Sequence, residues 1–371
     1  VSYDDAFEPN GRGERRAAEV TDAALTRIES VDRSDPLFLW VHYFDPHASY
    51  EPPAPFDANV DRYRGEIEYT DHEIGRLLDG LERAGRLENA LIVLVADHGE
   101  AFGEHGETHH GLFVYEPTVH VPMVVAWPGR VPSGAVLDVL ASQVDLVPTV
   151  HGLLGLAAPV ATDGVDLSPA LLGTGAPDAR RGVRIENLLP RLEFGWCALH
   201  AFREDGWKYI AAPRPELYLL DEDPFEAVNR VDDEPRRVEV ATRLLEDALA
   251  SSVAGSSSVP STIDPETVEQ LRSLGYVGSV APISIEPGPL VDPSLPDPKD
   301  RLEEYRVAKA VSAQLARGEF DAAVRETRRA LETDPDNLRV LHQLGEALLH
   351  SGRVEEGETV YRRILDAHPG D

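Results

Sequence analysis

Short apolar runs that alternate with amphipathic segments constrain the fold of this 371-residue chain more than any other feature of its sequence. Residues 37–44 (LFLWVHYF), 90–96 (ALIVLVA) and 121–127 (VPMVVAW) have the length and the apolar composition of buried strands. Residues 13–30 and 61–84 carry apolar side chains at helical spacing. In 61–84 the predicted buried face consists of Ile67, Ile74, Leu77, Leu78 and Leu81. Strands that alternate with helices predict a doubly wound α/β fold, with helices on both faces of a central sheet.

The pattern changes after residue 182. Residues 183–220 consist of short apolar segments separated by turn residues, which predicts a small antiparallel sheet appended to the α/β region. A predicted helix over 234–250 closes this region. We therefore expect residues 1–250 to form one α/β domain.

A linker over 251–300 is predicted to follow that domain. Residues 251–262 and 278–299 are rich in Ser, Gly and Pro, and a single short helix is predicted between them at 265–274. Segments of this composition seldom pack against both of their neighbours. We expect limited proteolysis to cut here first and to separate the C-terminal segment from the rest.

Residues 301–371 repeat with a fixed period. Gly318 and Gly352 lie 352 − 318 = 34 residues apart, and Pro335 and Pro369 have the same spacing. A period of 34 residues is that of the tetratricopeptide repeat, whose unit is a helical hairpin. The segment predicts two such units, and arrays of this kind bind protein partners. An unrelated helical hairpin is the alternative.

Composition limits the partners of the chain. Thirty-five basic and 66 acidic residues give a formal net charge of −31, which repels phosphate backbones and argues against nucleic acid as a partner. An anionic substrate must then be attracted by a local metal ion or by clustered His and Arg side chains. The single cysteine, Cys197, excludes an internal disulfide and any zinc site with several cysteines.

The sequence leaves the compartment open. It contains no run of about 18 apolar residues that would predict a transmembrane helix, and its first residues, VSYDDAFEPN, do not resemble a secretory signal. Because the chain starts without Met, we expect it to be part of a longer protein. The location of that protein, periplasmic and extracellular included, is not fixed.

The segment ADHGEAFGEHGETHHG, at 96–111, is the strongest candidate for chemistry. It follows the predicted strand at 90–96 directly, so Asp97 and His98 lie at the carboxyl end of that strand, where open α/β sheets place ligand sites. A carboxylate and an imidazole there can bind one divalent cation. Glycines let the loop bring further histidines to the same place, and these are His105, His109 and His110. A solvated His-rich loop is the alternative, whereas a His-x-x-x-His helical zinc site is excluded because the glycines disfavour a helix.

A second candidate follows the predicted strand at 37–44. Pro46 stops this strand, so His47 is expected to leave the sheet at the same carboxyl edge as Asp97, and the two strand ends converge on one pocket. A histidine held only by local hydrogen bonds is the alternative interpretation of His47. His42, inside the apolar run, is predicted to be a core histidine.

These segments together resemble the sulfatases, a family of the alkaline-phosphatase superfamily. The resemblance covers about residues 1–250 and rests on segments that follow that family's order: HYFDPHASYEPP, the helix and strand that end in ADHGEAFGEHG, HHGLFVYEPTVHVPMVV, VDLVPTVHGLLGL and WKYIAAPRPELYLLDEDPFEAVNR. It implies an alkaline-phosphatase-like central sheet flanked by helices, incomplete at its N-terminus, and a small antiparallel C-terminal subdomain. A fused tetratricopeptide array is also similar to known members of the family.

The resemblance implies roles for five residues. Asp97 and His98 match the metal-binding pair of the family, which makes a divalent metal ion the implied cofactor. His47 matches the histidine that contacts the sulfate group. His110 falls near a sulfate-contacting Lys or His, with His109 as the alternative. The family favours Ca²⁺, whereas an imidazole ligand favours Mn²⁺ or Zn²⁺.

One element of the family pattern is missing from the chain. Sulfatases are expected to form a formylglycine nucleophile from the Cys or Ser of a C/S-x-P-x-R motif, with acidic metal ligands earlier still. Cys197 stands in WCALH, and Ser34-Asp35-Pro36 lacks the arginine, so neither residue fits. We therefore expect the nucleophile to lie upstream of Val1 and the 371-residue chain alone to be inactive.

The resemblance implies a sulfuric ester hydrolase that displaces the leaving group of a sulfate ester at sulfur. His47 and His110 would stabilise charge on the sulfate group or protonate the leaving oxygen. The first alternative is a phosphodiesterase, phosphonate-ester hydrolase or phospho-group transferase of the same superfamily, since such relatives share the Asp-His-Gly turn and differ mainly in the nucleophile. The second is a tetratricopeptide scaffold with an inactive enzyme domain.

Overall fold

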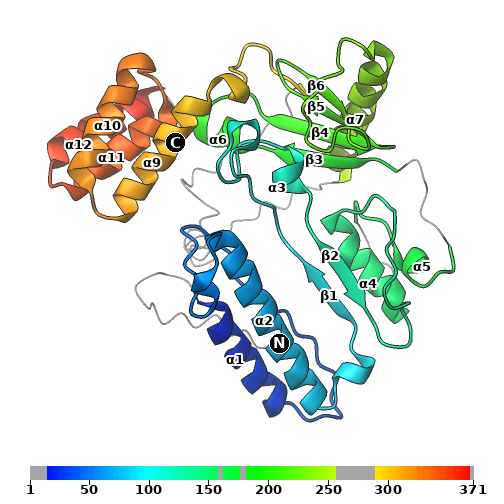
Figure 1. The fold of residues 1–371 in the computed structure, drawn as a ribbon. Helices are drawn as coiled ribbons and strands as arrows, with labels where there is room; N and C mark the ends of the chain where they lie inside the picture. The colour runs from blue at the N-terminus through cyan, green and yellow to red at the C-terminus, as the bar shows by residue number, and fades with distance from the viewer. Residues whose placement is uncertain (1–14, 158–161, 176–180, 256–288, 368–371) are drawn as a thin grey trace. The chain divides into compact units, whose positions relative to one another are not determined.

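The structure, a computed structural model, describes residues 15–157, 162–175, 181–255 and 289–367 (Figure 1). These residues form a mixed α/β structure with small sheets and a helical C-terminal segment, which confirms the predicted fold class. They divide into two compact units, and each unit is described by itself. Unit 1 comprises the residues up to Val93 together with 124–135, and unit 2 comprises 94–123 and the residues from Val136 onwards. The helix predicted at 265–274 lies outside the described residues.

Unit 1 is built on two helices, α1 (Ala17–Ser30) and α2 (Arg62–Arg83), which confirm the helices predicted over 13–30 and 61–84. The buried face of α2 differs from the predicted one. Ile67 is 43% exposed, whereas Glu66, Tyr69 and Glu73 are buried. The carboxylates are tolerated inside because they are bonded: Glu66, for example, accepts hydrogen bonds from two backbone amides.

Residues 37–44 do not form the predicted buried strand. Leu37, Leu39 and Val41 pack against the cluster formed by α1 and α2, but Phe38 and Trp40 are 90% and 82% exposed. Burial that alternates in this way is typical of an extended chain with one covered face, and no segment within the described ranges pairs with it as a strand. The prediction of a core histidine is also wrong, because His42 lies on the exposed face.

Two strands of the predicted central sheet are present among the described residues. They are β1 (Ile92–Val95) and β2 (Met123–Ala126), and they pair with each other. Every residue of β1 is only half-buried, and Val124 of β2 is 54% exposed, so the prediction of a fully buried strand at 90–96 is wrong. The physical reason is that a strand in a two-stranded sheet has one neighbour, while complete burial needs covered faces and two neighbours.

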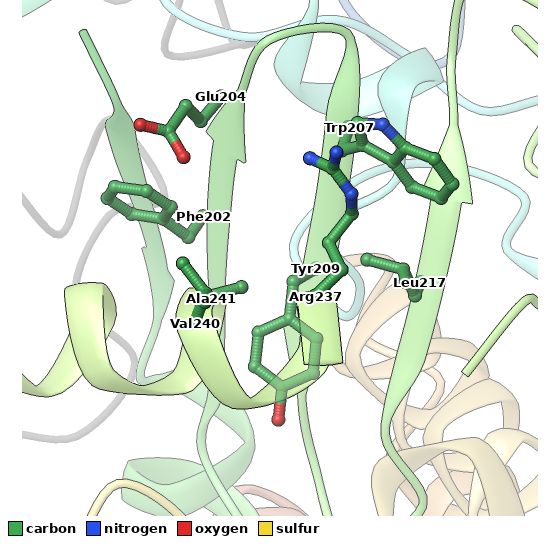
Figure 2. Close-up of a pocket in the computed structure, with 8 residues that line it drawn as sticks. All are labelled: Phe202, Glu204, Trp207, Tyr209, Leu217, Arg237, Val240 and Ala241. Atoms are coloured by element: carbon green, nitrogen blue, oxygen red, sulfur yellow. The ribbon is translucent and has the colours of Figure 1, made fainter. Parts of the chain in front are cut away.

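A four-stranded antiparallel sheet in unit 2 confirms the subdomain predicted over 183–220. Its order is β3-β4-β5-β6, and its strands are β3 (Val183–Asn187), β4 (Leu199–Glu204), β5 (Trp207–Ala211) and β6 (Glu216–Leu219). Because side chains alternate along a strand, one face of this sheet packs against α7 (Pro235–Gly255). Figure 2 shows this face, where the guanidinium of Arg237 lies 4.5 Å from the ring centre of Trp207. The opposite face packs on residues 112–115, which follow the histidine-rich segment.

Both ends of the predicted linker are ordered parts of unit 2. Helix α7 continues to Gly255, five residues beyond the predicted 234–250. Residues from Leu290 onwards pack on the four-stranded sheet, where the amide of Cys197 donates to the carbonyl oxygen of Pro296 (2.9 Å) and the buried Asp297 accepts from the amide of Arg214 (3.0 Å). The prediction of a linker over the whole of 251–300 is therefore wrong where 251–255 continue helix α7, and wrong from Leu290 onwards, where specific hydrogen bonds outweigh the Ser, Gly and Pro composition.

Two helical hairpins follow and confirm the predicted period. Their helices are α9 (Leu302–Ala316), α10 (Phe320–Thr333), α11 (Leu338–His350) and α12 (Val354–Ala367). Gly318 and Gly352 adopt φ angles of +72° and +80° in the turns between paired helices, a conformation that glycine reaches without steric cost. Tyr305 and Ala308 of α9, however, belong to the same core as the four-stranded sheet. This shared core contradicts the expected separation of the C-terminal segment.

The described residues also form four shorter α-helices, namely α3 (Glu116–Val119), α4 (Leu146–Leu154), α5 (Ser168–Leu171) and α6 (Leu189–Phe194), and several three-residue 3-10 helices. Within the described ranges, every helix is too short or too polar to cross a bilayer.

Candidate active site

Asp97 and His98 follow β1 directly and form the centre of the candidate site. The amide of His98 donates to Asp97 Oδ1 (2.9 Å), and His98 Nδ1 lies 2.8 Å from the carbonyl oxygen of Gly99. Donation from Nδ1 to that carbonyl leaves a lone pair on Nε2, which lies 3.8 Å from Asp97 Oδ2. A carboxylate oxygen and an imidazole nitrogen are both groups that can bind a divalent cation, and the role of this pair as metal ligands stays a prediction.

The backbone around this pair is held tightly. A Cβ atom added to Gly99 would lie 2.2 Å from the carbonyl oxygen of Pro117, so only glycine fits at this position. The side-chain amide of Gln143 donates to the carbonyl oxygens of Ala96 and Asp97, each at 2.7 Å. The direction in which the two side chains leave β1 is therefore fixed by neighbouring segments of unit 2.

Residues 98–111, called the histidine loop below, bring His110 onto His98. The two imidazole rings lie 3.8 Å apart, centre to centre, at an interplanar angle of 32°. Glu100, whose side chain is only 8% exposed, places Oε2 3.2 Å from His110 Nδ1 and Oε1 3.6 Å from His109 Nδ1. His110 is thus within hydrogen-bond distance of the carboxylate, whereas His109 lies beyond it.

His105 occupies a different position from the one its sequence predicts. Its ring stacks on the buried ring of Tyr115, with 3.6 Å between the ring centres and an interplanar angle of 12°. The backbone turns here with a φ of +51°. His105 therefore packs on the core that follows the loop, and the structure brings only His109 and His110 toward Glu100.

The buried side chain of Glu107 joins the histidine loop to the residue that follows it, Leu112. Glu107 Oε1 accepts a hydrogen bond from the amide of Leu112 (2.7 Å). Burial raises the pKa of this carboxyl to about 7, although the bonded amides act in the opposite direction. The loop therefore carries a structural carboxyl group in addition to Glu100.

His47 lies in unit 1, on the segment that precedes α2. Its amide donates to Glu66 Oε2 (3.0 Å), and the amide of Glu51 donates to the other oxygen of the same carboxylate (2.6 Å). Its ring packs on Phe44, with 4.4 Å between the ring centres. Glu66 therefore fixes the turn that presents His47, and burial raises the pKa of its carboxyl. The convergence of His47 with Asp97 stays a prediction.

The described residues offer a limited set of candidate metal ligands. Asp97 and His98 offer one oxygen and one nitrogen ligand, a pair that suits a divalent cation. Throughout residues 15–367, the three undescribed gaps apart, no three side chains of His, Cys, Asp or Glu are placed to hold one ion. A complete site needs ligands beyond this pair.

The sequence indicated the candidate Asp and His residues of the site. It did not indicate the residues whose hydrogen bonds and packing fix their positions. Glu100 and Glu107 lie in the quoted segment but carry no family role, and the only signal for them is an acidic residue inside a His-rich loop. Glu66 could have been suspected from its position among the apolar residues of a helix. No local signal points to Tyr305, whose hydroxyl bonds to a residue 195 positions away.

Comparison with known proteins covers both regions of the chain. Residues 2–156 match the family model described as Sulfatase, and residues 103–253 match the model described as N-sulphoglucosamine sulphohydrolase, C-terminal. Residues 314–371 match a tetratricopeptide repeat model. The first two matches include the whole candidate site.

Curated relatives with similar sequences are sulfatases. The choline-sulfatase of Rhizobium meliloti (strain 1021) is 32% identical over 187 residues, which are 48% of this chain and 34% of that protein. The N-acetylglucosamine-6-O-sulfatase of Bacteroides thetaiotaomicron is 32% identical over 117 residues, 32% of this chain and 21% of that protein. The chain therefore spans about a third or less of the length of these relatives.

Solved structures show the same fold at lower identity. BT4656, solved in complex with its substrate D-glucosamine-2-N,6-O-disulfate, has a TM-score of 0.56 and 18% identity, with 66% of this chain and 71% of that chain covered. The phosphonate monoester hydrolase SpPMH from Silicibacter pomeroyi has a TM-score of 0.55 and 20% identity, with 70% and 69% covered. At these identities the similarity shows the fold alone.

Proposed function

Residues 2–253 belong to the sulfatase family, and on this premise we propose that they form the metal-binding and sulfate-binding part of a sulfuric ester hydrolase. The observation that carries the proposal is the placement of His98 Nε2 beside Asp97 Oδ2, with the ring of His110 stacked on His98. Sulfatases are in general dependent on a divalent metal ion. Asp97 and His98 offer a pair of ligands for such an ion, and His110 offers a neighbouring imidazole.

We propose Asp97 and His98 as the metal ligands that this chain supplies. Asp97 contributes a negative charge, and His98 contributes Nε2 because its Nδ1 is bonded to the backbone. When bound, the ion polarises a sulfate oxygen and lowers the pKa of the attacking group. The family resemblance favours Ca²⁺ as the ion, and the imidazole ligand favours Mn²⁺ or Zn²⁺.

His110 is the loop histidine that we propose to contact the sulfate group. Its Nδ1 lies 3.2 Å from Glu100 Oε2, so the carboxylate can accept a hydrogen bond from Nδ1 and orient Nε2 toward a sulfate oxygen or the leaving oxygen. His109 is the weaker candidate, because its Nδ1 is 3.6 Å from the same carboxylate. We propose the same contact for His47, whose turn is fixed by Glu66.

The nucleophile belongs to a segment before Val1 in this proposal. The 371 residues contain no C/S-x-P-x-R motif, and they span only part of the length of the curated relatives. The proposed substrate class is a sulfate ester, the chemistry shared by relatives named for choline, N-acetylglucosamine-6-O- and aryl sulfates. The tetratricopeptide repeats indicate a protein partner in addition.

Two neighbouring histidines offer a matched test of this assignment. In the natural full-length protein we expect His110→Ala to lower kcat/KM for an aryl sulfate by about 10²-fold, because a positioned acid is worth about 10²–10⁴-fold. His109→Ala should cost less than about tenfold, since its ring lies beyond hydrogen-bond distance of Glu100. Steady-state kinetics on both variants decides the matter. A larger loss in His109→Ala would transfer the role to His109, and full activity of both would refute it.

A further inference from the structure

One face of helix α9 lies on the histidine loop. The residues concerned are Leu302, Tyr305, Arg306 and Lys309, which follow the spacing i, i+3, i+4 and i+7 of a single helical face. They belong to the first helix of the repeat segment, α9, which begins before the tetratricopeptide match at 314–371, whereas the histidine loop lies within the sulfatase matches. Both lie in unit 2, so their contacts can be described directly.

Two points of the loop are each bonded to α9, one near the C-terminal end of the loop and one in its middle. The hydroxyl of Tyr305 donates to the carbonyl oxygen of His110 (3.1 Å), and the guanidinium of Arg306 donates to the carbonyl oxygen of Gly106 (2.8 Å). Leu302 packs so closely at the second point that a Cβ atom on Gly106 would lie 2.4 Å from its Cδ2 atom. Gly106 also has a φ of +82°, so this close approach needs glycine for two reasons.

A lysine of the same helix, Lys309, acts on the loop through its charge, although its side chain is exposed. The ammonium of Lys309 lies 5.6 Å from the ring centre of Tyr305. Its charge lowers the pKa of Glu107, in opposition to the burial that raises it. Lys309 therefore adds an electrostatic influence of α9 on the loop to the two hydrogen bonds.

These contacts are embedded in a common core. Tyr305 is 6% exposed, and it packs in one cluster with Leu112, at the end of the loop, and with Phe194 of α6. A second contact comes from α11, where Arg339 pairs with Glu193 of α6 at 3.1 Å. The repeats are therefore packed on the sulfatase region around the loop.

We propose that α9 is a positioning element of the active site and that Tyr305 is the positioning residue that holds His110 through its carbonyl oxygen. The proposal rests on the proposed function, because a positioning role for Tyr305 has meaning only if His110 contacts the sulfate group. It makes the first helix of the repeat segment a structural part of the sulfate site. Nothing in the local sequence of either segment indicates this connection.

Hydrogen exchange tests the structural half of the proposal without any need for activity. In the natural full-length protein we expect Tyr305→Phe to accelerate amide exchange within 103–112 about fivefold, the factor that one hydrogen bond provides. Tyr361→Phe is the matched control, because Tyr361 packs on Gly345 within the repeats. It should leave exchange in the loop unchanged. Equal loop exchange in Tyr305→Phe and the wild type would overturn the proposal.

A second variant covers the case in which Tyr305→Phe does not fold. Arg306 is about half exposed, so Arg306→Met should leave the core intact while it removes the bond to Gly106. We expect exchange to rise around Gly106 in the loop. Unchanged exchange there would count against the proposal in the same way.

Kinetics tests the positioning half. For an aryl sulfate we expect Tyr305→Phe to raise KM about fivefold, because a displaced His110 binds the sulfate group less well. A loss of folded molecules alone would lower kcat and leave KM unchanged, and that result would refute the positioning role. If the wild-type protein hydrolyses no sulfate ester, the proposed function fails, and the exchange experiment still decides whether α9 holds the loop.

Discussion

Replacement of Asp97 by alanine is expected to remove the metal ion from the natural protein and to lower kcat/KM for a sulfate ester by about 10³-fold or more. The substitution deletes a charge and a ligand at once. It also removes the carboxylate that lies 3.8 Å from His98 Nε2 and accepts a hydrogen bond from the His98 amide. A metal ion supplies several kcal/mol of stabilisation to developing charge, and each 1.4 kcal/mol corresponds to tenfold in rate.

Metal content, measured by elemental analysis beside the kinetics, separates this effect from misfolding. Asp97→Asn preserves the shape of the side chain and should lose nearly as much metal, because the charge is gone. His98→Ala should lose less, since a neutral ligand contributes less than a charged one. Asp79→Ala, at an exposed position of α2, serves as the control. Full activity and full metal content in Asp97→Ala would end the assignment, and a metal-free wild-type protein would favour the scaffold alternative.

Lys208→Met is expected to lower the free energy of unfolding by about 3–5 kcal/mol, the cost of removing one partner from a buried ion pair. Lys208 is fully buried, and its Nζ lies 2.8 Å from Glu226 Oε1 and 3.0 Å from Glu116 Oε1. Glu226 is also buried and accepts a hydrogen bond from the amide of Glu116 (2.7 Å). Methionine fills a similar volume, so the loss comes mainly from the buried carboxylate of Glu226, which is left without its cation, whereas Glu116 keeps Arg203 at 3.2 Å.

Urea unfolding measures this loss, and its pH dependence identifies the cause. Burial already raises the pKa of Glu226, while Lys208 lowers it. Without the lysine, the pKa of the Glu226 carboxyl in the folded variant rises further above its value in the unfolded chain. The folded variant therefore carries a protonated Glu226 at acid pH, and its free energy of unfolding falls as the pH rises. We therefore expect a smaller deficit at pH 5 than at pH 8. Arg243→Met, which breaks the exposed pair with Glu239, should cost less than about 1 kcal/mol. Equal costs for the two variants would contradict the account.

The sequence predicted those parts of the fold that have a regular local pattern. The helices of unit 1, the antiparallel sheet and the 34-residue period follow from apolar spacing and from turn residues. The failures lie where burial depends on distant segments. Residues 37–44 are apolar throughout, yet only one face is covered by α1 and α2, so Trp40 is exposed. In α2, Glu66 is buried because it accepts hydrogen bonds from backbone amides, whereas the apolar Ile67 is exposed.

The candidate site divides in the same way. That Asp97, His98 and His110 lie close together could be predicted from the family motif that contains them, while their roles stay a prediction. The groups that orient them could not, since Glu66 acts on a turn 19 residues earlier and Tyr305 acts on a carbonyl group 195 residues earlier. A sequence pattern shows which residue types are available for chemistry. Contacts between distant segments decide which of them meet.

An assay of hydrolysis on a generic aryl sulfate and the matching aryl phosphate tests the central claim most directly. The natural full-length protein and the 371-residue chain are measured side by side, with and without added divalent metal. We predict sulfate-ester turnover by the full-length protein that exceeds its phosphate-ester turnover, and no turnover by the 371-residue chain, which lacks the C/S-x-P-x-R motif. Sulfatase turnover by the 371-residue chain alone would contradict the proposed upstream nucleophile. Phosphate-ester turnover by the full-length protein without sulfatase activity would contradict the proposed function itself.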